Sequence, residues 1–119
     1  MAVPDYQSFM LPILRLLADG KEHSLVELHG RLAGEMNLTS ADLEERLPSG
    51  TQTKYSNRVQ WSTVYLAKAG VLKRVRRTVL AITNRGRQLL LENHPKITVK
   101  LLSQFSVLKA IGHGRVSSF

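Results

Sequence analysis

The chain of 119 residues contains no cysteine, which excludes a disulfide framework, a thiolate metal site and a cysteine nucleophile. Long hydrophobic runs are also missing: the longest span a few residues, such as Val79–Ile82, and are too short for a transmembrane helix. The start of the chain lacks the pattern of a secretory signal. We therefore expect a reducing, cytoplasmic setting. With 43% apolar and 22% charged residues, the composition is typical of one globular domain.

Acidic residues are scarce in the second half of the chain. Residues 1–52 hold four basic and eight acidic residues, whereas residues 53–119 hold thirteen basic residues and one acid, Glu92. Nine basic residues and no acid occur from Lys54 to Arg87. Because like charges repel, a stretch with charges of only one sign indicates a polyanionic partner. Nucleic acid is the leading candidate, and an anionic membrane surface is the second.

Apolar periodicity and capping signals predict several helices. The Ser24-x-x-Glu27 pattern is a capping box, in which the Glu side chain reaches back to the cap. Gly70 is placed to end a helix in the left-handed conformation. The predicted helices lie within Asp5–Asp19, from Leu25 to about Met36, from Thr39 or Ser40 to Leu47, over Tyr55–Ala69, from Thr83 to Asn93, and from Thr98 onward.

Two short β-prone runs, Val71–Val75 and Val79–Ile82, predict a two-stranded hairpin. Helix, helix, short helix, helix, hairpin, helix is the order of a winged helix-turn-helix. We expect a mainly α fold of this kind, with a three-helix core, a wing of two or three strands and additional C-terminal helices. One domain over residues 1–111 and a tail over residues 112–119 are predicted. Because some winged helices bind only proteins, the order alone does not assign a function.

The helix predicted over Tyr55–Ala69 has a core side and an outward side. At 100° per residue the core side holds Val59, Ser62, Leu66 and Ala69, and the outward side is mostly small or amide-bearing. Small residues permit close approach to a DNA groove, and amides can pair with adenine edges. A merely solvated face would usually carry Glu with Lys at i, i+4 spacing. The DNA-binding residues predicted on this helix are Lys54, Ser56, Asn57, Arg58, Gln60 and Thr63.

Two side chains of this helix have alternative interpretations. Trp61 could stack on a base, but its angle favours packing at the edge of the core. Arg58 could instead hold the helix through a hydrogen bond near the core edge.

The hairpin and the start of the next helix carry the remaining predicted contacts. The hairpin carries four cations and no acid, which is more charge than is needed to prevent aggregation at a strand edge. Contact with phosphates or with the minor groove is therefore favoured. Cations at a helix N-terminus oppose its dipole, so stability does not explain Arg85 and Arg87. Alternate residues of a strand share a face, which would point Arg74 and Arg76 together. The predicted DNA-binding residues here are Lys73, Arg74, Arg76, Arg77, Arg85 and Arg87.

Several motifs match a known family over nearly the whole chain, to about Phe105. The most specific are Leu47-Pro48-Ser49-Gly50, Tyr55-x-Asn57-Arg58-Val59-x-Trp61 and Tyr65-Leu66-x-Lys68-Ala69-Gly70-Val71-Leu72. With them the chain resembles the amino-terminal domain of the Mrr family of restriction-system proteins. The resemblance implies a winged helix-turn-helix that recognises DNA, beside a nuclease domain that cuts modified DNA in the bacterial enzymes. The family's hairpin usually carries Arg-Gly near its tip, where this chain has Arg76-Arg77-Thr78.

No catalytic residue, metal site or cofactor is predicted. Gln52-Thr53-Lys54 matches part of a restriction-nuclease motif, but it lies in a polar loop, so we interpret the match as coincidence. The four histidines show no metal-binding spacing. The acids of the short helix, Asp42, Glu44 and Glu45, are expected to form a solvated face.

The predicted partner is double-stranded DNA, with no membrane and with a nuclease domain or subunit as a further partner. A small dimeric transcriptional regulator and a protein-interaction winged helix are the alternatives. The apolar face of the last predicted helix could join two copies into a homodimer, but it is better interpreted as a cover for the core. That face holds Leu101, Leu102, Phe105 and Leu108.

Overall fold

The computed structural model describes residues 3–104, which are mainly helical with a small antiparallel sheet. The predicted tail, the end of the predicted domain at residue 111, Phe105 and Leu108 lie outside the described residues. The elements are η1 (Tyr6–Phe9), α1 (Met10–Leu16), β1 (His23–Ser24), α2 (Leu25–Glu35), α3 (Ser40–Glu44), α4 (Lys54–Lys68), β2 (Leu72–Arg76), β3 (Val79–Ile82), α5 (Asn84–Leu91) and α6 (Val99–Leu102).

The helices begin where hydroxyl side chains accept backbone N–H groups that the first turn leaves unpaired. The caps predicted at Ser24, Thr83 and Thr98 are confirmed, since each accepts a bond from the residue three positions on. The capping box at Ser24 is only half formed. Glu27 does not reach back to the cap, because its carboxylate is bonded to His23 Nδ1 at 2.5 Å.

A complete capping box stands instead at the start of α3. Thr39 Oγ1 accepts from the N–H of Asp42, and the Asp42 carboxylate accepts from the N–H of Thr39. The hydrogen bond from the backbone N–H of Thr39 is the main cause of the lowered pKa of Asp42. The prediction that Asp42 belongs to a solvated face is therefore wrong: it is 3% exposed, whereas Glu44 and Glu45 are exposed as expected.

The sheet has three antiparallel strands in the order β1-β3-β2, which lies within the predicted wing of two or three strands. The sequence analysis missed β1, which pairs His23 with Leu80 and Ser24 with Val79. The register of β2 against β3 shifts between Arg74 and Arg76. This bulge interrupts the simple alternation on which the prediction of a shared Arg74–Arg76 face rested.

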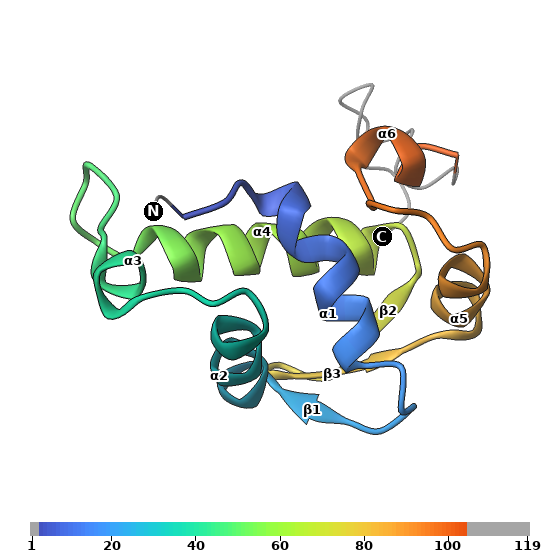
Figure 1. Cartoon of the computed structure of the whole chain (residues 1–119). Helices are drawn as coiled ribbons and strands as arrows, with labels where there is room; N and C mark the ends of the chain where they lie inside the picture. The colour runs from blue at the N-terminus through green and yellow to red at the C-terminus, as the bar shows by residue number, and fades with distance from the viewer. Residues whose placement is uncertain (1–2, 105–119) are drawn as a thin grey trace.

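The core lies between α1, α2, α4 and the inner face of the sheet. In Figure 1, α4 runs across the molecule with α1 packed against it, while the sheet lies below and α6 above. The core side predicted for α4 is confirmed, because Val59, Ser62, Leu66 and Ala69 are all buried. Leu102 of α6 is also fully buried, so the described part of the C-terminal apolar face covers the domain's own core.

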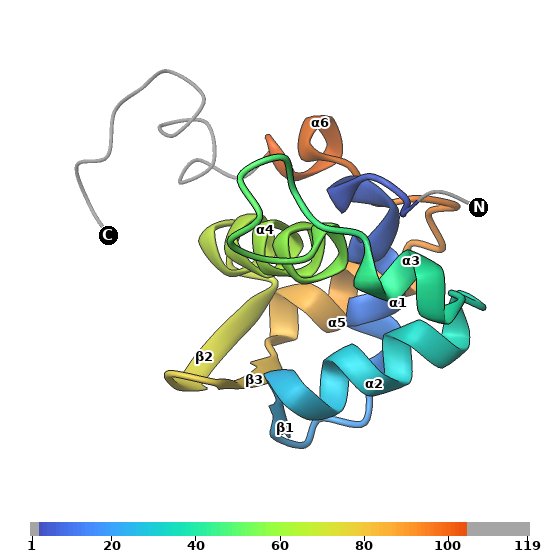
Figure 2. The ribbon, with the colours of Figure 1, turned by 90° about the vertical axis from the view of Figure 1, so that its left-hand side faces the viewer.

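The hairpin of β2 and β3 lies below α4 (Figure 2), and its turn contacts the start of α2, since the N–H of Leu25 donates to the Thr78 carbonyl at 2.8 Å. Gly70, with φ of +79°, provides the left-handed turn between α4 and β2 that the sequence predicts. This arrangement of helices and hairpin is compatible with a winged helix.

Candidate nucleic-acid interface

α4 is anchored at both ends by contacts with other elements. At its start, Thr53 Oγ1 accepts from the N–H of Ser56, and Lys54 Nζ lies 2.7 Å from Glu45 Oε2. The Tyr55 hydroxyl donates to the backbone carbonyl of His29 on α2 at 2.6 Å, and burial raises the pKa of Tyr55 to about 12. The predicted Lys54 contact thus faces a competing carboxylate.

The C-terminal end of α4 is capped by α5. Arg85 Nη1 donates to the carbonyl of Ala69 at 2.8 Å, and Thr83 Oγ1 donates to that of Gly70 at 2.6 Å. A cation beside the last carbonyls of a helix is favourable for the helix dipole. The structure therefore gives Arg85 a stabilising role in the fold, which the helix-dipole argument of the sequence analysis did not anticipate.

Thr63 does not belong to the outward face of α4. Its exposure is 1%, and its hydroxyl donates to the Gln60 carbonyl at 2.7 Å. The prediction is wrong because η1, α1, α3 and β2 all contact α4, so the buried arc of this central helix is wider than one core stripe. Gln60 remains exposed, and Ser56 and Asn57 are partly exposed.

Arg58 and Asn57 act as a pair on α4. Arg58 Nη1 donates to Asn57 Oδ1 at 3.0 Å, and both residues are half-buried. This contact occupies the amide oxygen and leaves the amide NH₂ of Asn57 as a donor. Within residues 3–104, Arg58 forms no ion pair, so its charge is not neutralised by an acid of the described fold.

Four exposed cations, Lys73, Arg74, Arg76 and Arg77, lie on β2 and the following turn. Arg76 Nη2 is 2.9 Å from Glu22 Oε1 in the segment before β1. Across the part of the chain that the structure describes, no acid pairs with Arg74 or Arg77. The tip of the hairpin is therefore cationic, as predicted, but one of its arginines is held by the acidic half of the chain.

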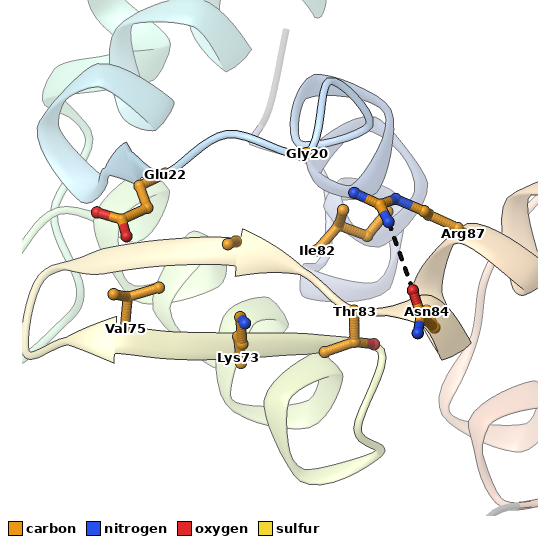
Figure 3. Close-up of a pocket in the computed structure, with 9 residues that line it drawn as sticks. Gly20, Glu22, Lys73, Val75, Ile82, Thr83, Asn84 and Arg87 are labelled. Carbon is orange, nitrogen blue, oxygen red and sulfur yellow. Dashed lines mark hydrogen bonds between the residues drawn. The ribbon is translucent and has the colours of Figure 1, made fainter.

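Lys73 and Arg87 lie apart from the hairpin tip, in a groove with a volume of about 460 Å³. Figure 3 shows Lys73 and Val75 on β2, Glu22 across the sheet, and Arg87 at one end beside Gly20. Arg87 Nη1 lies 3.4 Å from Asn84 Oδ1. A Cβ at Gly20 would lie 2.5 Å from Arg87 Nη2, so the absence of a side chain at Gly20 allows the guanidinium to occupy this position. Neither cation has an acidic partner within the described residues.

Trp61 is more exposed than its predicted position at the core edge implies. The residue is 48% exposed, and its ring lies 6.2 Å from that of Tyr65 on the same helix. The helical angle placed Trp61 at the margin of the core. The exposure of a side chain at that position depends on which neighbouring elements cover it. No signal in the sequence distinguished the two outcomes.

The described residues also bear on a metal site, on the restriction-nuclease match and on a membrane span. Residues 3–104 contain no group of three or more His, Cys, Asp or Glu side chains that could hold a metal ion. In the Gln52-Thr53-Lys54 match, Thr53 caps α4 and Lys54 pairs with Glu45, so both have roles in the local fold. No helix within that range is long and apolar enough to span a membrane.

Comparison with known proteins gives one family. A family model described as the Mrr N-terminal domain matches residues 6–92, which include every element from η1 to α5. No curated protein and no solved structure matches the chain. The match confirms the resemblance seen in the sequence and covers most of its 119 residues. The chain therefore belongs to the Mrr N-terminal domain family.

Proposed function

We propose that this chain is a winged helix-turn-helix that binds double-stranded DNA. α4 would enter the major groove, and the β2–β3 hairpin would act as a wing that contacts backbone or minor groove. The observation that carries the proposal is the acid-free stretch from Lys54 to Arg87, which forms α4, the hairpin and the start of α5. A duplex is the polyanion whose groove accepts a helix, and phosphate contacts would use the unpaired cations.

Two surfaces support the proposed docking. On α4, Gln60 is exposed, and Asn57 offers its amide NH₂ for base or phosphate contact. On the hairpin, Arg74 and Arg77 are exposed and unpaired among the described residues. In Figure 2 the hairpin lies below α4, so that one duplex could contact both elements.

The family match favours a role as the DNA-recognition part of a restriction system, with bond cleavage left to a nuclease domain or subunit. Binding, and not catalysis, is the activity we propose for this chain. Metal-dependent nicking by the purified chain would contradict that assignment. A homodimer through the C-terminal region is an additional hypothesis. A dimer should protect two half-sites that lie about one helical turn apart in a DNA footprint.

The proposal is tested by titrating the purified chain into methylated and unmethylated duplexes at several salt concentrations. With about five to eight phosphate contacts, log K against log salt should have a slope of roughly −5 to −7. Replacing Arg74 and Arg77 together with Ala should flatten that slope by about 2, or about 0.9 for each lost contact. A difference between the two duplexes would show that the modification is recognised.

The control removes two positive charges that lie outside the stretch from Lys54 to Arg87. Arg15 of α1 and Arg31 of α2 are exposed, and Arg31 Nη1 lies 3.4 Å from Glu27 Oε2. Their replacement with Ala should leave the slope unchanged. Equal effects of the two double variants would show that net charge, and not a defined surface, attracts DNA. No binding at low salt would favour the protein-interaction alternative.

A further inference from the structure

Three aromatic rings form a strip along one edge of α4, which we call the aromatic strip: Tyr6, Tyr65 and Trp61. Tyr6 stacks on Tyr65 with ring centroids 5.4 Å apart and an interplanar angle of 21°. Trp61, one helical turn before Tyr65, is 6.2 Å from it at 40°. Tyr6 and Tyr65 are partly buried, whereas Trp61 is 48% exposed. The indole is therefore the open end of the strip.

The support beneath Trp61 is fixed by hydrogen bonds. The Ser62 hydroxyl on α4 donates to the Tyr6 carbonyl, and the Asp5 carboxylate accepts from the N–H of Ser8 at 3.0 Å, which closes the η1 turn. Gln7 Oε1 accepts from the N–H of Val99 at 2.8 Å, so α6 holds η1 from the other side. Because the strip is already ordered, binding of a flat ligand to Trp61 would not lose free energy in ordering these side chains.

The cations of α4 favour an anionic ligand with a flat ring at the Trp61 end of the strip, whereas Asp5 lies at its Tyr6 end. α4 has Lys54, Arg58 and Lys68 and no acid, and Arg58 precedes Trp61 by three residues on the same face. Cations beside an exposed aromatic ring are the chemistry with which proteins bind unpaired nucleotides. An acidic peptide would satisfy the charge but gain little from a flat ring. Paired bases hide their faces in the duplex stack.

We infer that Trp61 stacks on an unpaired nucleobase, so that the chain also binds single-stranded or locally unpaired DNA. The inference rests on the proposed function for the DNA itself but concerns a different edge of α4. Trp61 and Tyr65 lie between the core side and the outward face carrying Gln60. A duplex read by the outward face could thus place an unpaired nucleotide at the strip.

The test uses Trp61 as its own probe, because it is the single tryptophan of the chain. The full chain is titrated with three oligonucleotides: a paired duplex, the same duplex with one unpaired thymidine, and oligo(dT). Stacking should quench the Trp61 emission with oligo(dT) and with the unpaired duplex, and much less with the paired duplex. The unpaired duplex should also bind more tightly than the paired one, by about tenfold.

Variants separate stacking from general attraction. Trp61→Leu should abolish the preference for the unpaired duplex while binding to the paired duplex stays unchanged, and Trp61→Phe should restore most of the preference. Leu91→Ala is the matched control, since Leu91 is an exposed apolar residue at the end of α5 with 73% exposure. It should leave both affinities unchanged. Circular dichroism and melting curves verify that each variant is folded.

The outcomes distinguish this inference from the proposed function. Salt-dependent duplex binding without preference for the unpaired thymidine, or a preference retained by Trp61→Leu, overturns the inference alone. Absence of binding to all three oligonucleotides overturns both. A Trp61 emission that changes on dilution of the free chain would show that a second copy covers the strip, which also overturns the inference.

Discussion

Two helical glycines should respond in opposite directions to replacement by alanine. Gly86, in the first turn of α5, is buried, and a Cβ there would lie 2.0 Å from the Val71 carbonyl oxygen and 2.7 Å from Ile82 Cγ1. The Val71 oxygen cannot move freely, because it accepts from the N–H of Thr83 at 3.2 Å. Gly30 lies in the middle of α2, and a Cβ there would have no atom within 4 Å.

The expected magnitudes follow from these contacts. Gly86→Ala must move α5 away from the start of the sheet, and overpacking of this kind costs about 3 kcal/mol. Gly30→Ala adds only helix propensity and reduces the freedom of the unfolded chain, which gives about 0.5–1 kcal/mol of stabilisation. At roughly 4 °C per kcal/mol for a domain of this size, we expect Tm to fall by about 12 °C for Gly86→Ala and rise by about 2–4 °C for Gly30→Ala.

Thermal melts followed by far-ultraviolet circular dichroism measure both changes under one set of conditions. Gly86→Ala should also weaken the anchoring of α4, because α5 carries Arg85 and follows Thr83, both bonded to the end of α4. Equal Tm values for the two variants would refute the close approach of α5 to Val71. If Gly86→Ala stabilised the protein, the packing of α5 against Val71 and Ile82 would be wrong.

Three further changes test individual interactions. The hydrogen bond with Asp19, opposed by burial and aided by Glu27, raises the pKa of His23 above its ordinary 6.5. Protonated His23 should therefore stabilise the fold fully below about pH 6.5, and this contribution should be lost as pH rises through the folded-state pKa. In urea unfolding, the stability of His23→Gln should depend less on pH than that of the wild type. Thr39→Ala removes the cap of α3 and should cost about 1 kcal/mol in the same assay, and an unchanged midpoint would deny the capping box a stabilising role. Tyr55→Phe removes the bond to the His29 carbonyl and should also cost about 1 kcal/mol, with no loss expected if that contact does not persist in solution.

The helices of the fold could be predicted because their signals are local. Ser24, Thr83 and Thr98 cap helices in the structure as the sequence indicates, and the change from helical periodicity to β-prone runs after Gly70 marks the hairpin. The missed β1 strand has two residues, and nothing in a His-Ser pair distinguishes a strand from a loop. It exists because β3 offers an open edge, which is a tertiary and not a local cause.

Three further errors concern single side chains, one with a tertiary cause and two with local causes. Thr63 is buried because several elements surround α4, and Asp42 is buried because its carboxylate closes a capping box. Glu27 leaves its own capping box for His23, which lies four residues earlier in the chain. For Asp42 and Glu27 the residue type allowed more than one local partner, and the sequence pattern did not indicate which one the side chain would bind.

The contacts between the acidic and basic halves bear directly on the proposed interface. Arg76 pairs with Glu22, and Lys54 pairs with Glu45, so two predicted DNA contacts already have acidic partners. The Arg76 and Glu22 side chains are 67% and 50% exposed, and a pair so accessible to water is worth little. A phosphate could replace Glu22 at small cost, because the guanidinium keeps one anionic partner throughout. The pair therefore leaves Arg74 and Arg77, which have no acidic partner among the described residues, for the proposed contact with DNA.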